Sequence, residues 1–275
     1  MALPVYASPG QRIWYYTLRL LCAAIFIYLI APIVVIIPLS FNSEPYFTYP
    51  LAGFSTRWYE EFFTSDQWQI GLKNSIIIGF LSTLLATCLG TLAALGLNRA
   101  DFRGKSAVMA VLISPIVVPI VITGAGMFYF YSSIGLTSTV PGIVLAHTTL
   151  GVPFVVITVS ATLVGFDHNM VRAGASLGAD PVKVFFKITL PLILPGVVSG
   201  ALFAFITSWD ELVVVIFLAS TEQHTLPRRM WSGIREMLSP TITAVATLLI
   251  IFSIMLMVTT ELLRRRTERL RGIRN

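Results

Sequence analysis

Charged residues are scarce in this chain of 275 residues: Asp, Glu, Lys and Arg together make up 12% of it. A soluble domain of average composition carries about twice that share. Hydrophobic residues, in contrast, make up 56% of the chain. The shortage of charge argues against an ordinary soluble enzyme or binding domain, and it predicts a protein that lies mostly in a lipid bilayer.

Catalytic and metal-binding motifs are also lacking. Cys22 and Cys88 both fall in apolar runs, where cysteine behaves as a small hydrophobe, so neither a disulfide framework nor a metal site is predicted. There is no glycine-rich phosphate loop with Lys and Ser or Thr, no G-x-S-x-G and no H-E-x-x-H. His147, His168 and His224 are isolated from one another; His147 is expected to pack in the core, or alternatively to line a pathway. We therefore expect no catalytic residue and no cofactor in this chain, so any energy for transport has to come from another subunit.

Six long apolar runs dominate the chain. Each reaches the roughly 20 residues that cross the hydrocarbon core as a helix. Because a helix satisfies its own backbone hydrogen bonds in lipid, the runs predict an all-α membrane protein with six transmembrane helices. The runs are approximately Leu20–Leu39, Ile70–Leu97, Ala107–Tyr131, Val140–Val164, Leu190–Ala219 and Thr241–Leu263.

The positive charges indicate the orientation. With the N-terminus in the cytoplasm, fourteen of the 19 Lys and Arg residues fall on the inner side, as the positive-inside rule requires. Six crossings then place both termini in the cytoplasm. The net charge of +6 reflects this topology and contact with anionic lipid. Since no basic face is combined with exposed stacking aromatics, no nucleic-acid partner is predicted.

The chain divides into three predicted parts. Residues 1–69 form an N-terminal anchor helix and an outer loop, residues 70–263 form the transmembrane core with a cytoplasmic loop at 165–190, and residues 264–275 form a basic cytoplasmic tail. In the outer loop, Trp58 and Tyr59 stand next to Glu60 and Glu61. This pattern favours an interfacial aromatic anchor, with contact to substrate or a receptor as the alternative.

The loop between the fourth and fifth runs reads VRAGASLGADPVKVFFKITLPLILPG from Val171 to Gly196. Its first half consists largely of small residues, which let another surface approach the backbone closely. Its second half carries an apolar stripe that includes Phe185 and Ile188, with Lys183 and Lys187 on other faces. These features predict a docking element for a cytoplasmic partner; an amphipathic segment lying on the bilayer surface is the alternative.

This loop resembles the EAA loop of type I ABC-importer permeases, whose pattern is roughly E-A-A-x-x-x-G, nine variable residues and I-x-L-P. The matching positions here are Arg172, Ala173, Gly174, Gly178, Ile188, Leu190 and Pro191. The chain departs from the pattern at Arg172, where the family usually has Glu, and at Gly174, where it usually has Ala. The resemblance implies the type I permease fold and coupling helices that sit in a cleft of an ATPase subunit. The candidate ATPase-coupling residues are Arg172, Ala173, Gly174, Leu177, Gly178, Ala179, Asp180, Phe185, Ile188 and Pro191.

Two acids interrupt the fifth apolar run: Asp210 and Glu211 follow Trp209 directly. A charge at the bilayer centre costs about 2.5–3.5 kcal/mol on insertion scales, so at least one acid is expected to face a polar pathway or a partner. A carboxylate beside an aromatic ring suits an organic cation, because the ring face adds about 0.5–2 kcal/mol of cation–π attraction. These three residues are the candidate substrate pathway. Alternatively, the acids pair with Lys73 or an outer arginine, or cap a break in the helix.

The segment from Ser208 to Leu249 is similar to spermidine/putrescine permeases in its W-D-E-L-V-V, T-L-P and S-P-T-I-T-A-V-A-T-L-L pieces. The resemblance implies a permease subunit of the bacterial inner membrane that imports a small organic cation such as putrescine or spermidine. It also implies a second, different permease chain, two cytoplasmic ATPase subunits that bind ATP and Mg, and a periplasmic binding protein. Permeases for opines, phosphonates, gamma-aminobutyrate and ferric ion are closely related. An ion-coupled secondary transporter is a further alternative, although no internal repeat supports it.

Overall fold

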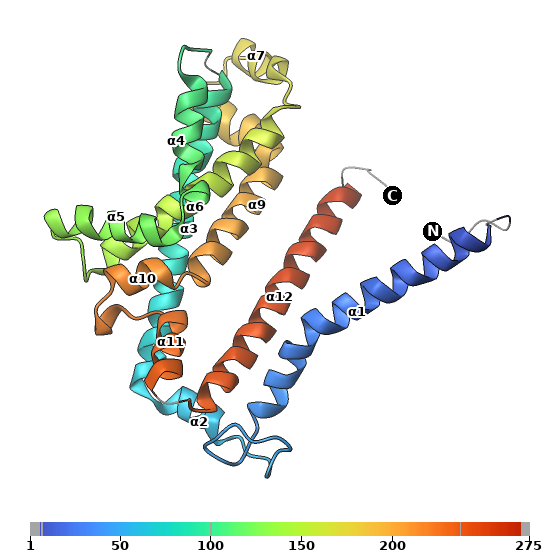
Figure 1. The fold of residues 1–275 in the computed structure, drawn as a ribbon. Helices are drawn as coiled ribbons and strands as arrows, with labels where there is room; N and C mark the ends of the chain where they lie inside the picture. Colours follow the sequence, from blue (N-terminus) through green and yellow to red (C-terminus); the bar gives the residue numbers. More distant parts are fainter. Residues whose placement is uncertain (1–5, 7, 100, 237, 271–275) are drawn as a thin grey trace. The chain divides into compact units, whose positions relative to one another are not determined.

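The computed structural model describes residues 6, 8–99, 101–236 and 238–270, and its elements are helical throughout (Figure 1). Within these residues the only extended pairing is an isolated bridge between Asn42 and Phe54, which confirms the predicted all-α class. The longer helices are α1 (Pro9–Leu39), α2 (Arg57–Thr64), α3 (Asp66–Arg99), α4 (Lys105–Val117), α5 (Ile120–Ser133), α6 (Val140–Leu163), α7 (His168–Ser176), α9 (Leu190–Trp209), α11 (Leu226–Glu236) and α12 (Thr241–Leu270). Short elements are α8 (Pro181–Val184), the π-helical turn η1 (Phe185–Thr189), α10 (Val213–Leu218) and the 3₁₀ turn η2 (Thr221–Gln223).

Five of the described helical stretches are long and apolar enough to cross a membrane, and a bent pair makes up to six. Five of the six predicted runs each correspond to one helical stretch. The stretch that matches the fifth run ends at Trp209 and not at Ala219 as predicted. The third run differs, because α4 and α5 meet at an angle of 106°.

The bend between α4 and α5 has a local cause at Pro119. Proline disfavours helical geometry in the residue before it and has no amide to donate to the preceding turn. Val118 accordingly has extended backbone angles (φ −72°, ψ 132°), and α4 ends there. The helix restarts where the amide of Ile122 donates to the carbonyl of Pro119 at 2.9 Å. The third apolar run therefore forms two helices at an angle and not one continuous helix.

The described residues form two compact units, one within 1–65 and 233–275 and the other within 66–232. In the first unit, Trp58 is buried and donates through its indole nitrogen to the carbonyl of Asn42 at 2.6 Å. The hydroxyl of Thr241 donates to Glu61 at 2.9 Å, which joins α12 to α2. Trp58 thus holds the loop after α1, whereas Phe63 is the exposed aromatic side chain of α2. The predicted basic tail at 264–275 lies outside the residues whose side chains are described.

The second unit is built on α3, α6 and α9, which run side by side (Figure 1). Small residues let these helices approach closely: a Cβ added at Gly151 would lie 3.0 Å from the Cβ of Ala204 and 3.1 Å from that of Ala86. A Cβ at Gly90 would lie 2.6 Å from the Cβ of Val155, so this close approach of α3 and α6 also depends on a small residue. The three backbones are thus locked at the centre of the unit. Helix α7 and the start of α4 lie at one end of it (Figure 1).

Candidate functional site

The cytoplasmic loop predicted at 165–190 begins with α7. Asp167 caps this helix by accepting a hydrogen bond from the amide of Asn169 at 2.9 Å. At the other end, Gly178 has a φ of +80°, a left-handed geometry that glycine adopts at little cost. Its amide donates to Ala175 at 3.0 Å, and the next amide, of Ala179, donates to Gly174 at 3.1 Å. Gly178 therefore ends α7 and reverses the chain.

Asp180 starts the second half of the loop as the cap of α8. Its carboxylate accepts a hydrogen bond from the amide of Lys183 at 2.9 Å, and this bond lowers the pKa of Asp180. The Lys183 ammonium lies 3.3 Å from the same carboxylate. Since both side chains are exposed, this ion pair adds little to stability. Asp180 thus has a structural role at the turn, whatever else it contacts.

Gly174 and Ile188 hold the two halves of the loop together. Gly174 is buried, and a Cβ at this position would lie 2.6 Å from the Cδ1 of Ile188. Val184 and Thr189 are buried in the same region. The departure from alanine at position 174 thus lets α7 approach the segment that leads into α9 more closely than alanine allows without movement of Ile188.

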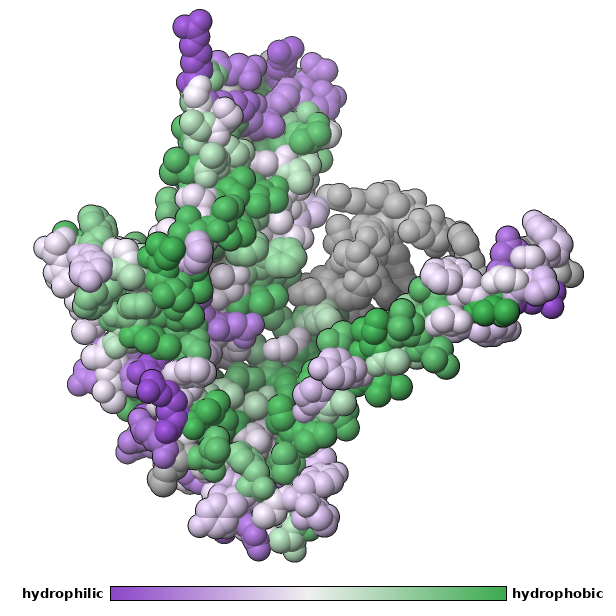
Figure 2. Space-filling model, in the orientation of Figure 1, coloured by the Kyte–Doolittle hydropathy of each residue, from purple (hydrophilic) through white to green (hydrophobic). Residues whose placement is uncertain are grey.

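The other candidate coupling residues divide by exposure. Half-buried positions are Ala179 and Phe185; exposed positions are Arg172, Ala173, Leu177, Gly178, Asp180 and Pro191. Leu177 is 88% exposed and Phe186 is 59% exposed. The end of the unit that carries α7 is mostly hydrophilic on the face shown in Figure 2. This end therefore presents isolated apolar side chains in a polar setting.

A continuous helical stretch leaves the loop and runs through the unit. From Pro181 to Trp209 the chain passes through α8, the π-helical turn η1 and α9 without a non-helical residue. At 1.5 Å per residue, its 29 residues span about 44 Å. The loop is thus attached to one end of a long helix, and the candidate pathway residues lie at its other end.

The sequence predicts a single helix through Ala219, but α9 ends at Trp209 and α10 begins at Val213. Glu211 is buried, and its carboxylate accepts a hydrogen bond from the amide of Val214 at 2.8 Å. Glu211 therefore caps α10, which is one of the alternatives that the sequence left open. Asp210, in contrast, is exposed. The two acids therefore differ in exposure, and both lie in the break between α9 and α10.

Trp209 is 8% exposed, and its ring stacks on Phe205 with ring centroids 5.5 Å apart. The ring packs against the turn of α3 that contains Gly79, where an added Cβ would lie 3.9 Å from the indole. In this conformation its face is therefore covered by protein, and Asp210 is the accessible member of the three candidate pathway residues.

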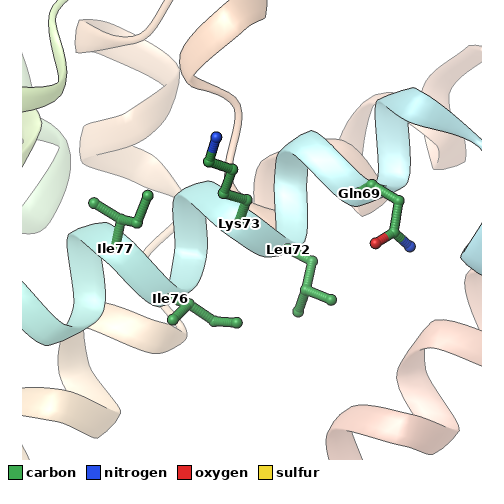
Figure 3. Close-up of a pocket in the computed structure, with 5 residues that line it drawn as sticks. All are labelled: Gln69, Leu72, Lys73, Ile76 and Ile77. Atoms are coloured by element: carbon green, nitrogen blue, oxygen red, sulfur yellow. The ribbon is translucent and has the colours of Figure 1, made fainter.

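A shallow hollow of about 250 Å³ lies along α3 and is lined by Gln69, Leu72, Lys73, Ile76 and Ile77 (Figure 3). Four of the five side chains are uncharged, and the fifth is the ammonium of Lys73, so the hollow lacks any acid that would hold an organic cation. Among the described residues, neither Asp210 nor Glu211 forms an ion pair with Lys73. Within the described part of the chain, no group of three His, Cys, Asp or Glu residues has the geometry of a metal site.

These features define a class: a helical membrane protein with a polar turn-rich loop at one end of a transmembrane helix and an acid at the other. Residues 86–270 match the family described as the binding-protein-dependent transport system inner membrane component. The chain belongs to this family and is a permease subunit of an ABC importer in the inner membrane.

Relatives of known function support this assignment. The chain is 35% identical over 244 residues to PotC of Haemophilus influenzae, a spermidine/putrescine transport system permease protein, covering 89% of this chain and 95% of PotC. It is 36% identical over 255 residues to PotI of Escherichia coli K12, a putrescine transport system permease protein, covering 90% and 88%. A bacterial ABC transporter for the import of alginate has the same fold, with a TM-score of 0.76 at 15% identity over 94% of this chain and 99% of that one. The predicted permease fold is thereby confirmed.

Proposed function

We propose that this chain imports a polyamine, putrescine or spermidine, as one half of the transmembrane part of an ABC importer. The observation that carries the proposal is the 35–36% identity, over most of both chains, to permeases named for these substrates. The exposed carboxylate of Asp210 at the end of α9 is consistent with it, since a polyamine is an organic polycation.

The complex would contain a second, different permease chain, two cytoplasmic ATPase subunits and a periplasmic binding protein. ATP and Mg would bind to the ATPase subunits, so this chain would need no cofactor of its own. We place both termini in the cytoplasm on the distribution of Lys and Arg. The end of the core that carries α7 then faces the ATPase subunits, and the end of α9 at Asp210 faces away from them.

The exposed residues of the loop are proposed as the ATPase contact. Arg172, Ala173, Leu177 and Gly178 would touch the ATPase directly, since they are exposed on α7 and its terminal turn. Gly174 and Ile188 would act differently, by holding the two halves of the loop together so that the docked surface moves as one piece. Arg172 stands where the family usually has Glu, so the ATPase is expected to offer an acidic or carbonyl acceptor at this point.

The helical stretch from Pro181 to Trp209 would carry the movement into the membrane. Closure of the ATPase pair on ATP would displace the loop, and a continuous helix transmits such a displacement to its far end because its backbone hydrogen bonds resist compression. A cavity open to the outside would then receive the substrate from the binding protein, and ATP hydrolysis would restore the inward-facing state. This is alternating access driven from outside the chain.

In the pathway, Asp210 would pair with an ammonium group of the substrate. Trp209 is proposed to hold the turn that presents Asp210, because its ring is packed on Phe205, and to offer its face to the cation only if the end of α9 rearranges during the cycle. Glu211 would keep α10 in register through its cap.

The test is ATP hydrolysis by the purified complex in a lipid bilayer, with its ATPase and binding protein, in the presence and absence of putrescine or spermidine. Stimulation by either polyamine supports the proposal. Assembly and basal turnover without stimulation would refute the polyamine substrate and direct the search to opines, phosphonates, gamma-aminobutyrate and ferric ion. Uptake by the chain without any ATPase would refute the importer mechanism and favour an ion-coupled transporter.

A further inference from the structure

A buried row of polar side chains crosses the three central helices next to the end of α9. His147 of α6 is 1% exposed, and its Nδ1 lies 2.7 Å from the hydroxyl oxygen of Ser208 on α9. The hydroxyl of Ser82 on α3 lies 3.0 Å from the same oxygen. We define His147, Ser208 and Ser82 as the polar clasp.

The clasp ends on the turn of α3 that also supports the aromatic pair of α9. The Ser82 hydroxyl lies 3.2 Å from the carbonyl of Gly79, and a Cβ added to Gly79 would lie 3.3 Å from the ring of Phe205. Phe205 in turn stacks on Trp209. One turn of α3, from Gly79 to Ser82, therefore donates one hydrogen bond to Ser208 and packs against the rings of Phe205 and Trp209.

Ser208 connects the clasp, because the Nδ1 of His147 and the hydroxyl of Ser82 both hydrogen-bond to its single hydroxyl oxygen. Among the described residues, nothing bonds to the Nε2 of His147, so Ser208 is the polar anchor of the imidazole ring. A buried hydrogen bond whose partner is removed leaves an unpaired polar group, which costs more than the bond itself contributes. The clasp is therefore a strong constraint on the last turn of α9.

We infer that His147 is a positioning residue: acting through Ser208, it sets the place and direction of Asp210 two residues further on. Loss of the clasp frees the last turn of α9 to rotate or fray, because Ser208 then has no fixed partner on α6. The role in substrate uptake rests on the proposed function, whereas the role in placing residue 210 does not depend on which substrate is carried.

The experiment measures the place of residue 210 directly. The parent is the full complex carrying Asp210→Cys, with the exposed Cys22 and Cys88 replaced by serine, and the probe is a cationic methanethiosulfonate reagent whose rate of reaction is recorded. His147→Phe keeps an aromatic ring, although a larger one, and removes the hydrogen bond; Ser208→Ala removes the shared hydroxyl with a smaller change in volume. His147→Asn keeps a polar atom close to the position of Nδ1. Thr87→Val is the control, since among the residues that the structure describes the Thr87 hydroxyl donates within its own helix, to the carbonyl of Thr83 at 2.7 Å.

We expect His147→Phe and Ser208→Ala to shift the labelling rate by about fivefold, the population change that follows the loss of one buried hydrogen bond. His147→Asn and Thr87→Val should label at the parent rate. Unchanged rates in both His147→Phe and Ser208→Ala would overturn the inference, as would His147→Asn behaving like His147→Phe. If His147→Phe does not assemble, Ser208→Ala decides alone.

In the chain that retains Asp210, His147→Phe should raise the apparent KM for putrescine uptake by about fivefold on the same reasoning. A lower amount of assembled complex with an unchanged KM would overturn the positioning role, because that is what a purely structural histidine predicts. A parent complex that takes up no polyamine would refute the proposed substrate only, and the labelling rates would still decide the inference.

Discussion

Replacement of Gly178 by valine tests the backbone geometry of the loop separately from its side-chain packing. Gly178 has a φ of +80°, and no heavy atom lies within 4 Å of an added Cβ, so a side chain there meets no steric obstacle beyond its own backbone. The left-handed region costs an L-residue about 1–2 kcal/mol, and a β-branched residue is an outlier there. Such a penalty changes a conformational ratio by a factor of about 5–30.

We therefore expect Gly178→Val to lower the polyamine-stimulated ATP turnover of the complex by about 5–30-fold, because the loop spends less time in the geometry that docks. Membrane insertion and the amount of purified chain should not change, since Gly178 is exposed and belongs to no core contact. The assay is ATP hydrolysis at saturating binding protein and substrate, normalised to the assembled complex.

Two variants serve as controls for this prediction. Gly165→Val places the same side chain at another exposed glycine before α7, where φ is not positive and no heavy atom lies within 4 Å; it should retain full turnover. Gly178→Asn should fall between the parent and Gly178→Val, since asparagine enters the left-handed region more readily than other residues. Equal turnover of Gly178→Val and Gly165→Val would refute the reasoning.

Three further variants test other parts of the molecule. Asp210→Asn keeps the side-chain volume and removes the charge; a charge-assisted hydrogen bond contributes about 1.5–3 kcal/mol, so the KM for polyamine uptake should rise at least about tenfold, and an unchanged KM would remove Asp210 from the pathway. Glu211→Ala removes the acceptor of the Val214 amide and should lower the stability of the folded chain by about 1 kcal/mol, measured as a lower Tm. Glu211→Gln keeps an acceptor and should lose less stability. Equal Tm values for the two variants would contradict the capping role of Glu211. Gly200→Ala places a Cβ 2.8 Å from the Cα of Val155 and should cost about 1–3 kcal/mol, again measured by Tm, while Gly126→Ala, where no heavy atom lies within 4 Å, should cost little.

Hydropathy predicts where this chain crosses the membrane, but not where its helices break. The third run contains Pro119, whose effect on Val118 is local and foreseeable, yet the angle of 106° depends on how α5 packs against α10. The fifth run stays apolar through Leu218, so hydropathy alone extends the helix past Trp209. Only the two acids mark the break, and their roles are separated by the fold: Glu211 caps and Asp210 is exposed.

The candidate site was predictable to a similar degree. The sequence marks Gly178 as a candidate coupling residue, but it does not predict the turn with positive φ that Gly178 forms after α7. The close approach of Gly174 to Ile188 depends on how the loop folds back on itself, so the departure from alanine could be noticed in the sequence but not explained. Ser208 and Ser82 gave no signal at all, because their hydrogen bond joins residues 126 positions apart and serine is common in apolar helices.

The position of the glycine contacts along α9 bears on how the proposed coupling loop would act on the proposed substrate pathway. Gly200 lies against α6, where an added Cβ would lie 2.5 Å from the hydroxyl oxygen of Thr158 and 2.8 Å from the Cα of Val155. At 1.5 Å per residue, this contact is about 18 Å from Ile188 and about 15 Å from Asp210. A rigid tilt about such a contact moves the two ends of α9 in opposite directions by similar amounts, so a displacement of the loop by an ATPase reaches Asp210 almost undiminished. The polar clasp lies between the Gly200 contact and Asp210, on the part of α9 whose movement would displace Asp210. Transmission by tilting therefore requires Ser82 and His147 either to follow Ser208 or to release it, and the labelling rate at position 210 with and without ATP distinguishes these two cases.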